Sequence, residues 1–248
     1  VLRSIDIILR EVSNLKRIGA EFGQQEAGTL SIATTHTQAR YVLPGPITQF
    51  RRRYAQVRVE LHQGTPDQVA RMLLDETADL GLATEALAHY DDLVTLPCYD
   101  WQHVIIVPKG HPLGEIERPT LEQLATYPLV SYHPTVAGRP RIDQAFAKAN
   151  LTPSFALEAL DSDVIKTYVA LGLGVGIVAS MAFEPERDRH LRAIDAGHLF
   201  RSSTTRVAIR RGAILRGYAY SFIELFASQL TRNVIDKALA GQAAQYDL

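Results

Sequence analysis

The sequence offers little for disulfide, metal or membrane chemistry. Its single cysteine, Cys98, excludes an intramolecular disulfide framework and a zinc site made of several cysteines. No apolar run approaches the roughly 18 residues of a membrane-spanning helix, and the first residues are too rich in charge for a signal peptide. The 26 basic and 27 acidic side chains leave a formal net charge of -1, so bulk electrostatics favours neither nucleic acid nor a membrane as partner. We therefore expect a cytoplasmic protein without a membrane partner.

What is present is the composition of a globular protein. Of the 248 residues, 46% are hydrophobic, which is enough for the cores of one large or two small domains. From Thr29 onward, strand and helix patterns alternate at short intervals, as in sheets that are covered by helices on both faces. The order of elements breaks around residues 96–100 and again around residues 196–203, and we interpret each break as a strand that crosses between two sheets. The predicted fold class is α/β, with two Rossmann-like subdomains joined by two crossover strands.

The two breaks also set the expected subdomain boundaries. We assign residues 28–97 together with residues 202–240 to subdomain I, and residues 98–201 to subdomain II. Apolar residues at helical spacing near the end of the chain predict one closing helix from about residue 217 to residue 240. Two small sheets joined in this way leave a cleft between them, which is a common place for a ligand.

The first 27 residues precede this body. Between Leu2 and Ile18, apolar residues recur at three- and four-residue steps, which predicts a helix with a narrow apolar stripe. Such a stripe either packs on its own domain or pairs with a helix of another subunit. Because the chain starts at Val1 and not at Met, we expect a fragment or a processed chain from which an N-terminal module is missing.

Uncharged hydrogen-bond donors gather where three predicted strands end. They are Thr35, Thr37 and Gln38 after the first strand, Gly64 and Thr65 after the second, and Thr84 after the third. Open α/β sheets bind ligands outside the carboxyl ends of their strands. Hydroxyl and amide groups, together with the free N–H groups of a helix's first turn, hold an anion without a basic side chain. We therefore predict an anion-binding site made by these residues.

Helix capping is the alternative for each of these residues taken singly. Ser, Thr, Asn and Asp cap helices at about 1 kcal/mol each, and Thr65 followed by Pro66 has the form of a helix start. Caps have no reason to face one cleft, so the convergence of three strand ends favours a ligand site. His36, inside the first group, is expected to point away from that site.

Other candidate sites are weaker. The glycines of residues 172–176 lack the G-x-G-x-x-G spacing, and they predict a helix stop followed by a closely packed strand. Asp91 with Asp92, and Asp161 with Asp163, flank turns, and the second pair precedes a helix, where acids are favoured. The eight histidines show no metal-ligand spacing, and no nucleophile elbow or phosphate-binding loop is present. We predict no catalytic residue, no metal and no cofactor, and a binding protein in place of an enzyme.

Four longer strings carry more information than their chemistry alone, and they are "ATTHTQARY", "HQGTP", "DSDVIKTYVALGLGVGIVAS" and "FIELFASQLTR". From Gly28 to about Ala238 the chain resembles, in the order and spacing of such strings, the CysB-like branch of the LysR-type transcriptional regulators. The resemblance implies a fold like that of type 2 periplasmic binding proteins. It also implies that residues 1–27 correspond to the linker helix behind a winged helix-turn-helix, a DNA-binding module that is missing from this sequence.

The resemblance further implies a cytoplasmic homo-oligomer, usually a tetramer, that binds DNA through the missing module and controls sulfur-assimilation genes. Its effector would be a small anion such as sulfate, acetylserine or adenosine phosphosulfate. The anion-binding residues of the family match Thr35, Thr37, Gln38 and Thr84. Tyr99 and Trp101 lie where aromatic walls of the pocket are expected. Ala137 stands where relatives usually have threonine, so only a backbone N–H serves there.

Two functions of other classes stay open at this point. A solute-binding protein of a transport system has the same fold, and it would need an export signal at the start of the full gene. An α/β enzyme that acts on an acetylated amino acid is the second alternative, and it would turn over its substrate.

Overall fold

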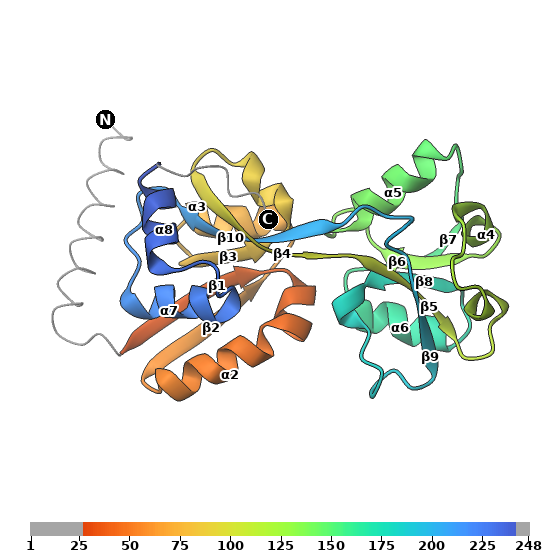
Figure 1. Ribbon diagram of the computed structural model, residues 1–248, viewed down its shortest axis with the longest axis horizontal. Helices are drawn as coiled ribbons and strands as arrows, with labels where there is room; N and C mark the ends of the chain where they lie inside the picture. The colour runs from red at the N-terminus through yellow and green to blue at the C-terminus, as the bar shows by residue number, and fades with distance from the viewer. Residues whose placement is uncertain (1–26, 242–248) are drawn as a thin grey trace.

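The computed structural model describes residues 27–241, so the predicted linker helix lies outside the described residues except for Ala27. Two lobes lie side by side, each built on a five-stranded sheet (Figure 1). The prediction of an α/β protein with two subdomains joined by crossing strands is confirmed. Within the described residues, no helix is long and apolar enough to span a membrane.

The first lobe combines the two ends of the described chain. Its sheet has the order β2-β1-β3-β10-β4, in which β1 is parallel to β2 and β3, and β10 is antiparallel to β3 and β4. Its elements are β1 (Gly28–Thr34), η1 (Gln38–Val42), α2 (Pro44–Arg53), β2 (Val57–Gln63), α3 (Pro66–Leu74), β3 (Leu80–Ala83), η2 (Glu85–His89), β4 (Leu93–Trp101), β10 (Ser203–Arg210), α7 (Gly217–Phe226) and α8 (Arg232–Leu239).

The second lobe is one continuous stretch of chain. Its sheet has the order β7-β6-β8-β5-β9, with β6 parallel to β7 and β8, and β5 antiparallel to β8 and β9. Its elements are β5 (His103–Pro108), η3 (Pro112–Glu115), α4 (Leu121–Ala125), β6 (Leu129–Tyr132), α5 (Arg139–Lys148), β7 (Phe155–Ala159), α6 (Ser162–Ala170), β8 (Val175–Ala179), η4 (Ser180–Ala182) and β9 (Leu191–Asp195).

Helices cover both faces of each sheet, and this explains why the central strands read as nearly continuous apolar runs. On one face of the first sheet, α2 and α7 meet through Phe50 and Phe222, whose ring centroids are 5.6 Å apart. On the other face α3 buries Val69 and Leu73. In the second lobe α4 and α5 pack on one face and α6 on the other. Each lobe therefore has its own core, and the space between the lobes is left for a ligand.

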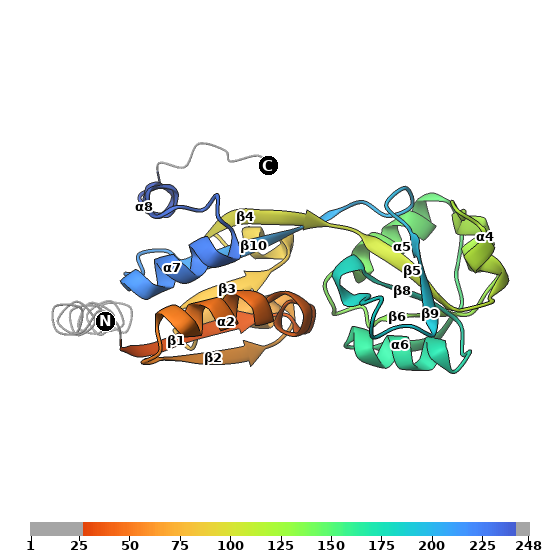
Figure 2. The same ribbon diagram turned by 60° about the horizontal axis from the view of Figure 1, so that its bottom comes forward.

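Two antiparallel strands connect the lobes (Figure 2). The pairing of β4 with β10 continues to Trp101 opposite Ser203, and Gln102 alone separates β4 from β5. The expected boundary between residues 97 and 98 thus falls inside β4, because strand pairing keeps Cys98 and the residues after it with the first sheet. The return segment, residues 196–202, is irregular until β10 begins.

The single closing helix predicted for residues 217–240 is wrong, because the structure has two helices there, α7 and α8. The break begins at Ala227, whose backbone is extended with φ -145° and ψ 95°. In the break, Gln229 Nε2 donates to the carbonyl oxygen of Cys98 in β4 at 2.6 Å, and Leu230 is buried. Contacts with β4 therefore outweigh the helical pattern of the sequence.

Candidate functional site

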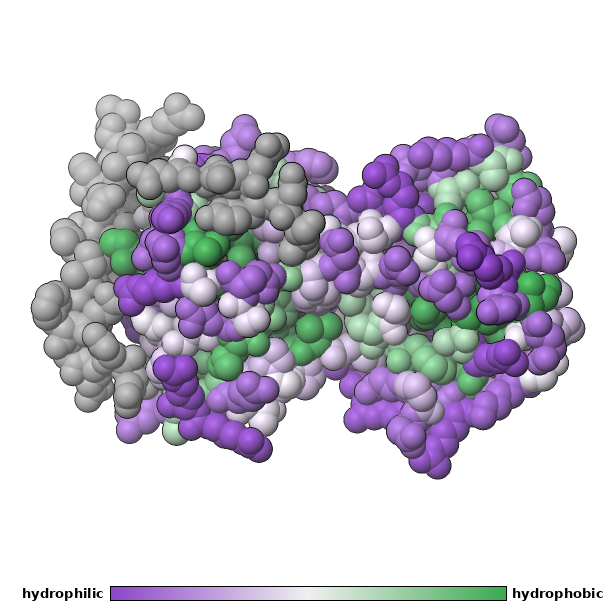
Figure 3. Space-filling model, in the orientation of Figure 1, coloured by the Kyte–Doolittle hydropathy of each residue, from purple (hydrophilic) through white to green (hydrophobic). Residues whose placement is uncertain are grey.

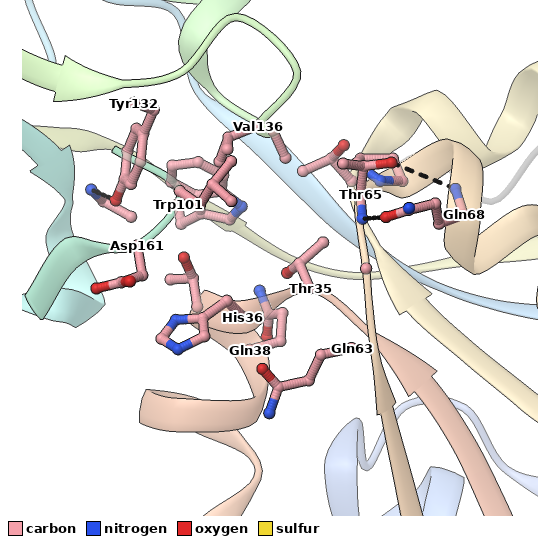
Figure 4. A pocket seen from close by; sticks show the side chains of 17 residues that line it. Thr35, His36, Gln38, Gln63, Thr65, Gln68, Trp101, Tyr132, Val136 and Asp161 are labelled. Carbon is pink, nitrogen blue, oxygen red and sulfur yellow. Dashed lines mark hydrogen bonds between the residues drawn. The ribbon is translucent and has the colours of Figure 1, made fainter. Parts of the chain in front are cut away.

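A cavity of about 370 Å³ lies between the lobes (Figure 4), at the waist visible in the space-filling view (Figure 3). The first lobe supplies the residues that follow β1, β2 and β3, and the second lobe supplies the ends of β6, β7 and β8 with residues 136 and 137. The carboxyl ends of two sets of parallel strands thus face each other. The volume falls within the range of about 300–1,000 Å³ that is typical of small-molecule pockets.

The structure brings eight of the nine predicted site residues into this cavity, namely Thr35, Thr37, Gln38, Gly64, Thr65, Thr84, Trp101 and Ala137. The ninth, Tyr99, is not part of the lining. Its hydroxyl donates to Gln38 Oε1 at 2.5 Å, while Gln38 Nε2 donates to Thr205 Oγ1 at 2.9 Å. Tyr99 therefore fixes the orientation of the Gln38 amide and does not form a wall of the pocket.

Capping accounts for the hydroxyl of Thr65 and not for the hydroxyls of Thr37 and Thr84. Thr65 closes a capping box at the start of α3, where its Oγ1 accepts from Gln68 N at 3.4 Å and Gln68 Oε1 accepts from Thr65 N at 2.8 Å. Thr37 precedes η1 and Thr84 precedes η2, and neither side chain makes a capping hydrogen bond. The hydroxyls of Thr37 and Thr84 are therefore not needed by the helices that they precede.

Backbone N–H groups add to these donors. The first helical hydrogen bond after β1 runs from Ala39 N to Thr35 O at 3.0 Å. The N–H groups of His36, Thr37 and Gln38 precede it, so they have no carbonyl in their own helix to pair with. The partial positive charge at such a helix start favours an anion nearby.

The lining contains neither lysine nor arginine, and all of its residues are described. Its one acid, Asp161, caps α6 by accepting from Val164 N at 2.8 Å. Binding to neutral donors depends less on salt than pairing with an exposed counter-charge does. Among the residues that the structure describes, no cluster of His, Cys, Asp and Glu could hold a metal ion.

His36 was misjudged from the sequence, and Tyr132 was missed. The prediction that His36 points away is wrong: it lines the cavity, and its buried Nδ1 has no hydrogen-bond partner among the described residues. Trp101 lines the cavity, and its Nε1 is also buried and unpartnered within that part of the chain. Tyr132, at the end of β6, shares a hydrogen bond with Ser162 Oγ at 2.7 Å, and burial raises the pKa of its hydroxyl. Nothing in its apolar sequence context marks Tyr132 as a cavity residue.

Two sheets with a ligand-sized cavity between their strand ends are the architecture of a ligand-binding domain, and the comparison with known proteins gives its class. Residues 23–231 match the LysR substrate binding domain, and the chain belongs to this family. It is therefore the effector-binding domain of a LysR-type regulator, a family of transcriptional regulators and not of enzymes.

Particular relatives narrow the family further. The chain is 52% identical to the HTH-type transcriptional regulator CysB of Burkholderia cenocepacia, over all of this chain and 79% of that protein. It is also 52% identical to the regulator SsuR of the same organism, over 91% of this chain and 73% of the relative. Among solved structures, the cofactor-binding domain of the Cbl transcriptional regulator is 44% identical with a TM-score of 0.82, over 86% of this chain and 93% of the other.

Proposed function

We propose that the cavity binds a small anion of sulfur metabolism, such as sulfate, acetylserine or adenosine phosphosulfate. In this proposal the domain is the sensor of a cytoplasmic, homotetrameric regulator of sulfur-assimilation genes. The observation that carries the proposal is the set of uncharged donors at three strand ends, two of which, Thr37 and Thr84, have no capping role. Similarity to regulators named CysB, SsuR and Cbl supports this function over that of a solute-binding protein for transport.

Anion binding at this place would change how the lobes are arranged. Donors of the first lobe, such as Thr37, face lining residues of the second lobe, such as Tyr132 and Ala137, across the cavity. A ligand shifts a conformational equilibrium only through its difference in affinity for the two arrangements. An anion that touches both lobes has such a difference, because only one spacing lets it meet both sets of contacts. The shift would then pass to the DNA-binding module of the full-length protein.

The decisive experiment is calorimetry of sulfate with the Thr37→Val variant. Valine keeps the shape of threonine and removes the hydroxyl, so the variant loses one hydrogen bond to a charged group. Because such a bond contributes about 1.5–3 kcal/mol, we expect affinity for sulfate to fall by about 10- to 100-fold. Thr48→Val is the matched control, because Thr48 is exposed on α2 and bonds only its own helix at Pro44 O. Sulfate binding that is unchanged in Thr37→Val would contradict the assignment of the anion site.

A further inference from the structure

A second cavity of about 500 Å³ adjoins the first and also lies between the lobes. The first lobe lines it with the start of α3 and with η2, and the second lobe lines it with residues 134–138 and the first turns of α5. The two cavities share four lining residues: Pro66 and Thr84 of the first lobe, and Val136 and Ala137 of the second. They are therefore neighbouring chambers of one cleft, and they meet at these four residues.

The charges of the second cavity differ from those of the first. Glu85 Oε1 pairs with Arg141 Nη2 at 2.5 Å, and Glu85 Oε2 accepts from Thr204 N at 3.1 Å. Asp67 Oδ1 accepts from the Tyr90 hydroxyl at 2.8 Å. The lining has the carboxylates of Asp67 and Glu85 against the one guanidinium of Arg141, so with His89 counted as neutral its formal charge is negative. This cavity disfavours an anion and favours an uncharged or cationic polar group.

Ala137 has the smallest side chain of the four residues at the junction between the cavities. The backbone next to it is fixed, because Gly138 has φ +93° and a Cβ there would lie 2.8 Å from His103 Nε2 and 3.0 Å from the Trp101 ring. Ala137 itself presents only a methyl group to both cavities. A β-branched side chain at this position would narrow the junction without altering the donors at the ends of β1, β2 and β3.

We propose that the two cavities together bind one organic anion, with its negative group in the first cavity and an uncharged or cationic polar remainder in the second. Ala137 is then a specificity-determining residue, because its small side chain lets the ligand extend from one cavity into the other. This inference rests on the proposed function, since it places the negative group at Thr37 and Thr84. Inorganic sulfate would fill only the first cavity.

The test compares inorganic sulfate with two organic probes, adenosine phosphosulfate and O-acetylserine, by calorimetry on the same variants. For Ala137→Val we expect affinity for both organic probes to fall by about tenfold or more, since added methyl groups obstruct a filled site. Affinity for sulfate should fall by less than affinity for the organic probes, because sulfate occupies the first cavity alone, and an unchanged midpoint of urea denaturation shows that the variant is folded. Ala147→Val, on the exposed side of α5 and outside both cavities, is the matched control.

The variant Asp67→Asn tests whether the part of the ligand in the second cavity is cationic or uncharged. It should weaken binding of O-acetylserine, whose ammonium group is cationic, and leave adenosine phosphosulfate unaffected or bound more tightly. Organic probes that bind no more tightly than sulfate, or that bind Ala137→Val as well as the unaltered domain, would overturn the inference. The proposed function would survive that result as long as sulfate binding still depends on Thr37. Loss of the Thr37 dependence would instead overturn both.

Discussion

His103 lies at the junction of the lobes, where β5 begins directly after Gln102. Its ring is fully buried beside Trp101 and Phe200, with ring centroids 5.2 Å and 5.6 Å away. Neither ring nitrogen has a hydrogen-bond partner among residues 27–241. Burial, with a smaller contribution from the positive charge of Arg141, lowers the pKa of His103 from 6.5 to about 4. The imidazole is therefore neutral in the folded domain at neutral pH.

This lowered pKa predicts a loss of stability in mild acid. In the unfolded chain His103 takes up a proton below pH 6.5, whereas the folded domain resists protonation until about pH 4. Protons therefore favour the unfolded state in this interval, and the free energy of unfolding falls as the pH falls from 6.5 to 4. Between pH 7 and pH 5 we expect His103 to account for a loss of about 2 kcal/mol, measured by urea denaturation.

The variant His103→Leu isolates this contribution. Leucine has no polar atom to leave unpaired, so the variant should be at least as stable as the unaltered domain at pH 7. Between pH 7 and pH 5, the free energy of unfolding of the variant should fall by about 2 kcal/mol less than that of the unaltered domain. His133→Leu is the control, because it makes the same substitution at an exposed histidine. Equal pH slopes for His103→Leu and the unaltered domain would contradict the assignment.

At the scale of elements, the start of α3 has a counterpart in the other lobe. Thr120 caps α4 with the same capping box that Thr65 makes at α3, since Gln123 takes the place of Gln68. Thr65 lines the first cavity and Thr120 lines neither cavity. The pair therefore separates capping from ligand binding within a single chain.

We expect Thr65→Ala and Thr120→Ala each to lower the free energy of unfolding by about 1 kcal/mol, because each removes one cap. Only Thr65→Ala should also change sulfate affinity, and by less than Thr37→Val does, since the hydroxyl of Thr65 is already committed to Gln68. Urea denaturation and calorimetry on the two variants measure both effects. A loss of affinity from Thr120→Ala as large as that from Thr65→Ala would mean that stability, and not contact, governs binding.

Elements with strong local signals were predictable from the sequence, and elements that depend on tertiary contacts were not. The helix start at Thr65 and Pro66 was predicted because cap and proline act locally. The glycines after α6 also behave as predicted: Gly172 has φ +81°, and a Cβ on Gly174 would lie 2.2 Å from the Pro128 carbonyl oxygen. The break at Ala227 was missed because it depends on the contact between Gln229 and β4, which no local pattern contains.

The cavity shows the same difference between local signals, which the sequence contains, and tertiary contacts, which it does not. The residues contributed by the first lobe follow strands, and parallel strands bring their carboxyl ends to one edge, so their convergence could be inferred from the sequence. Tyr132 and Asp161 of the second lobe could not be inferred, because their place in the cavity depends on how the lobes face each other. His36 was misjudged for a different reason: its direction is set by the short helix that begins directly after Thr35.

For the molecule as a whole, side-chain contacts join the lobes on two sides of the cleft. On one side, Arg40 Nε and the Tyr41 hydroxyl donate to the Asp163 carboxylate at 3.1 Å and 2.6 Å, and the Tyr41 ring packs on the apolar cluster of the second lobe. On the other side Arg141 pairs with Glu85. Burial and the bond to Asp163 raise the pKa of Tyr41, so its hydroxyl stays a donor at neutral pH. These contacts favour the arrangement of lobes described above.

Tyr41→Phe should weaken anion binding although Tyr41 does not line the first cavity. The variant removes one hydrogen bond between the lobes and keeps the ring, so a smaller fraction of molecules adopts the binding arrangement. Apparent affinity falls with that fraction, and we expect a loss of about three- to tenfold for sulfate. Calorimetry measures the affinity, and small-angle scattering measures the spacing of the lobes.

Tyr220→Phe is the matched control for Tyr41→Phe. Tyr220 donates to Asp236 at the same 2.6 Å, but both residues belong to the first lobe. Loss of this hydrogen bond should lower the free energy of unfolding and leave the spacing of the lobes unchanged. If both variants bind sulfate equally well and scatter alike, the contact at Asp163 does not control the arrangement.

The position of β10 between β3 and β4 has a consequence for the order in which a ribosome would complete the two lobes. The second lobe is one uninterrupted stretch, so all of its strands have emerged before β10 does. The first lobe begins earlier but lacks an inner strand until residues 203–210 are translated, and until then β3 and β4 have no partner between them. Because domains generally fold as units during synthesis, the later half of the ligand cleft is finished first, and the half that begins the sequence closes last.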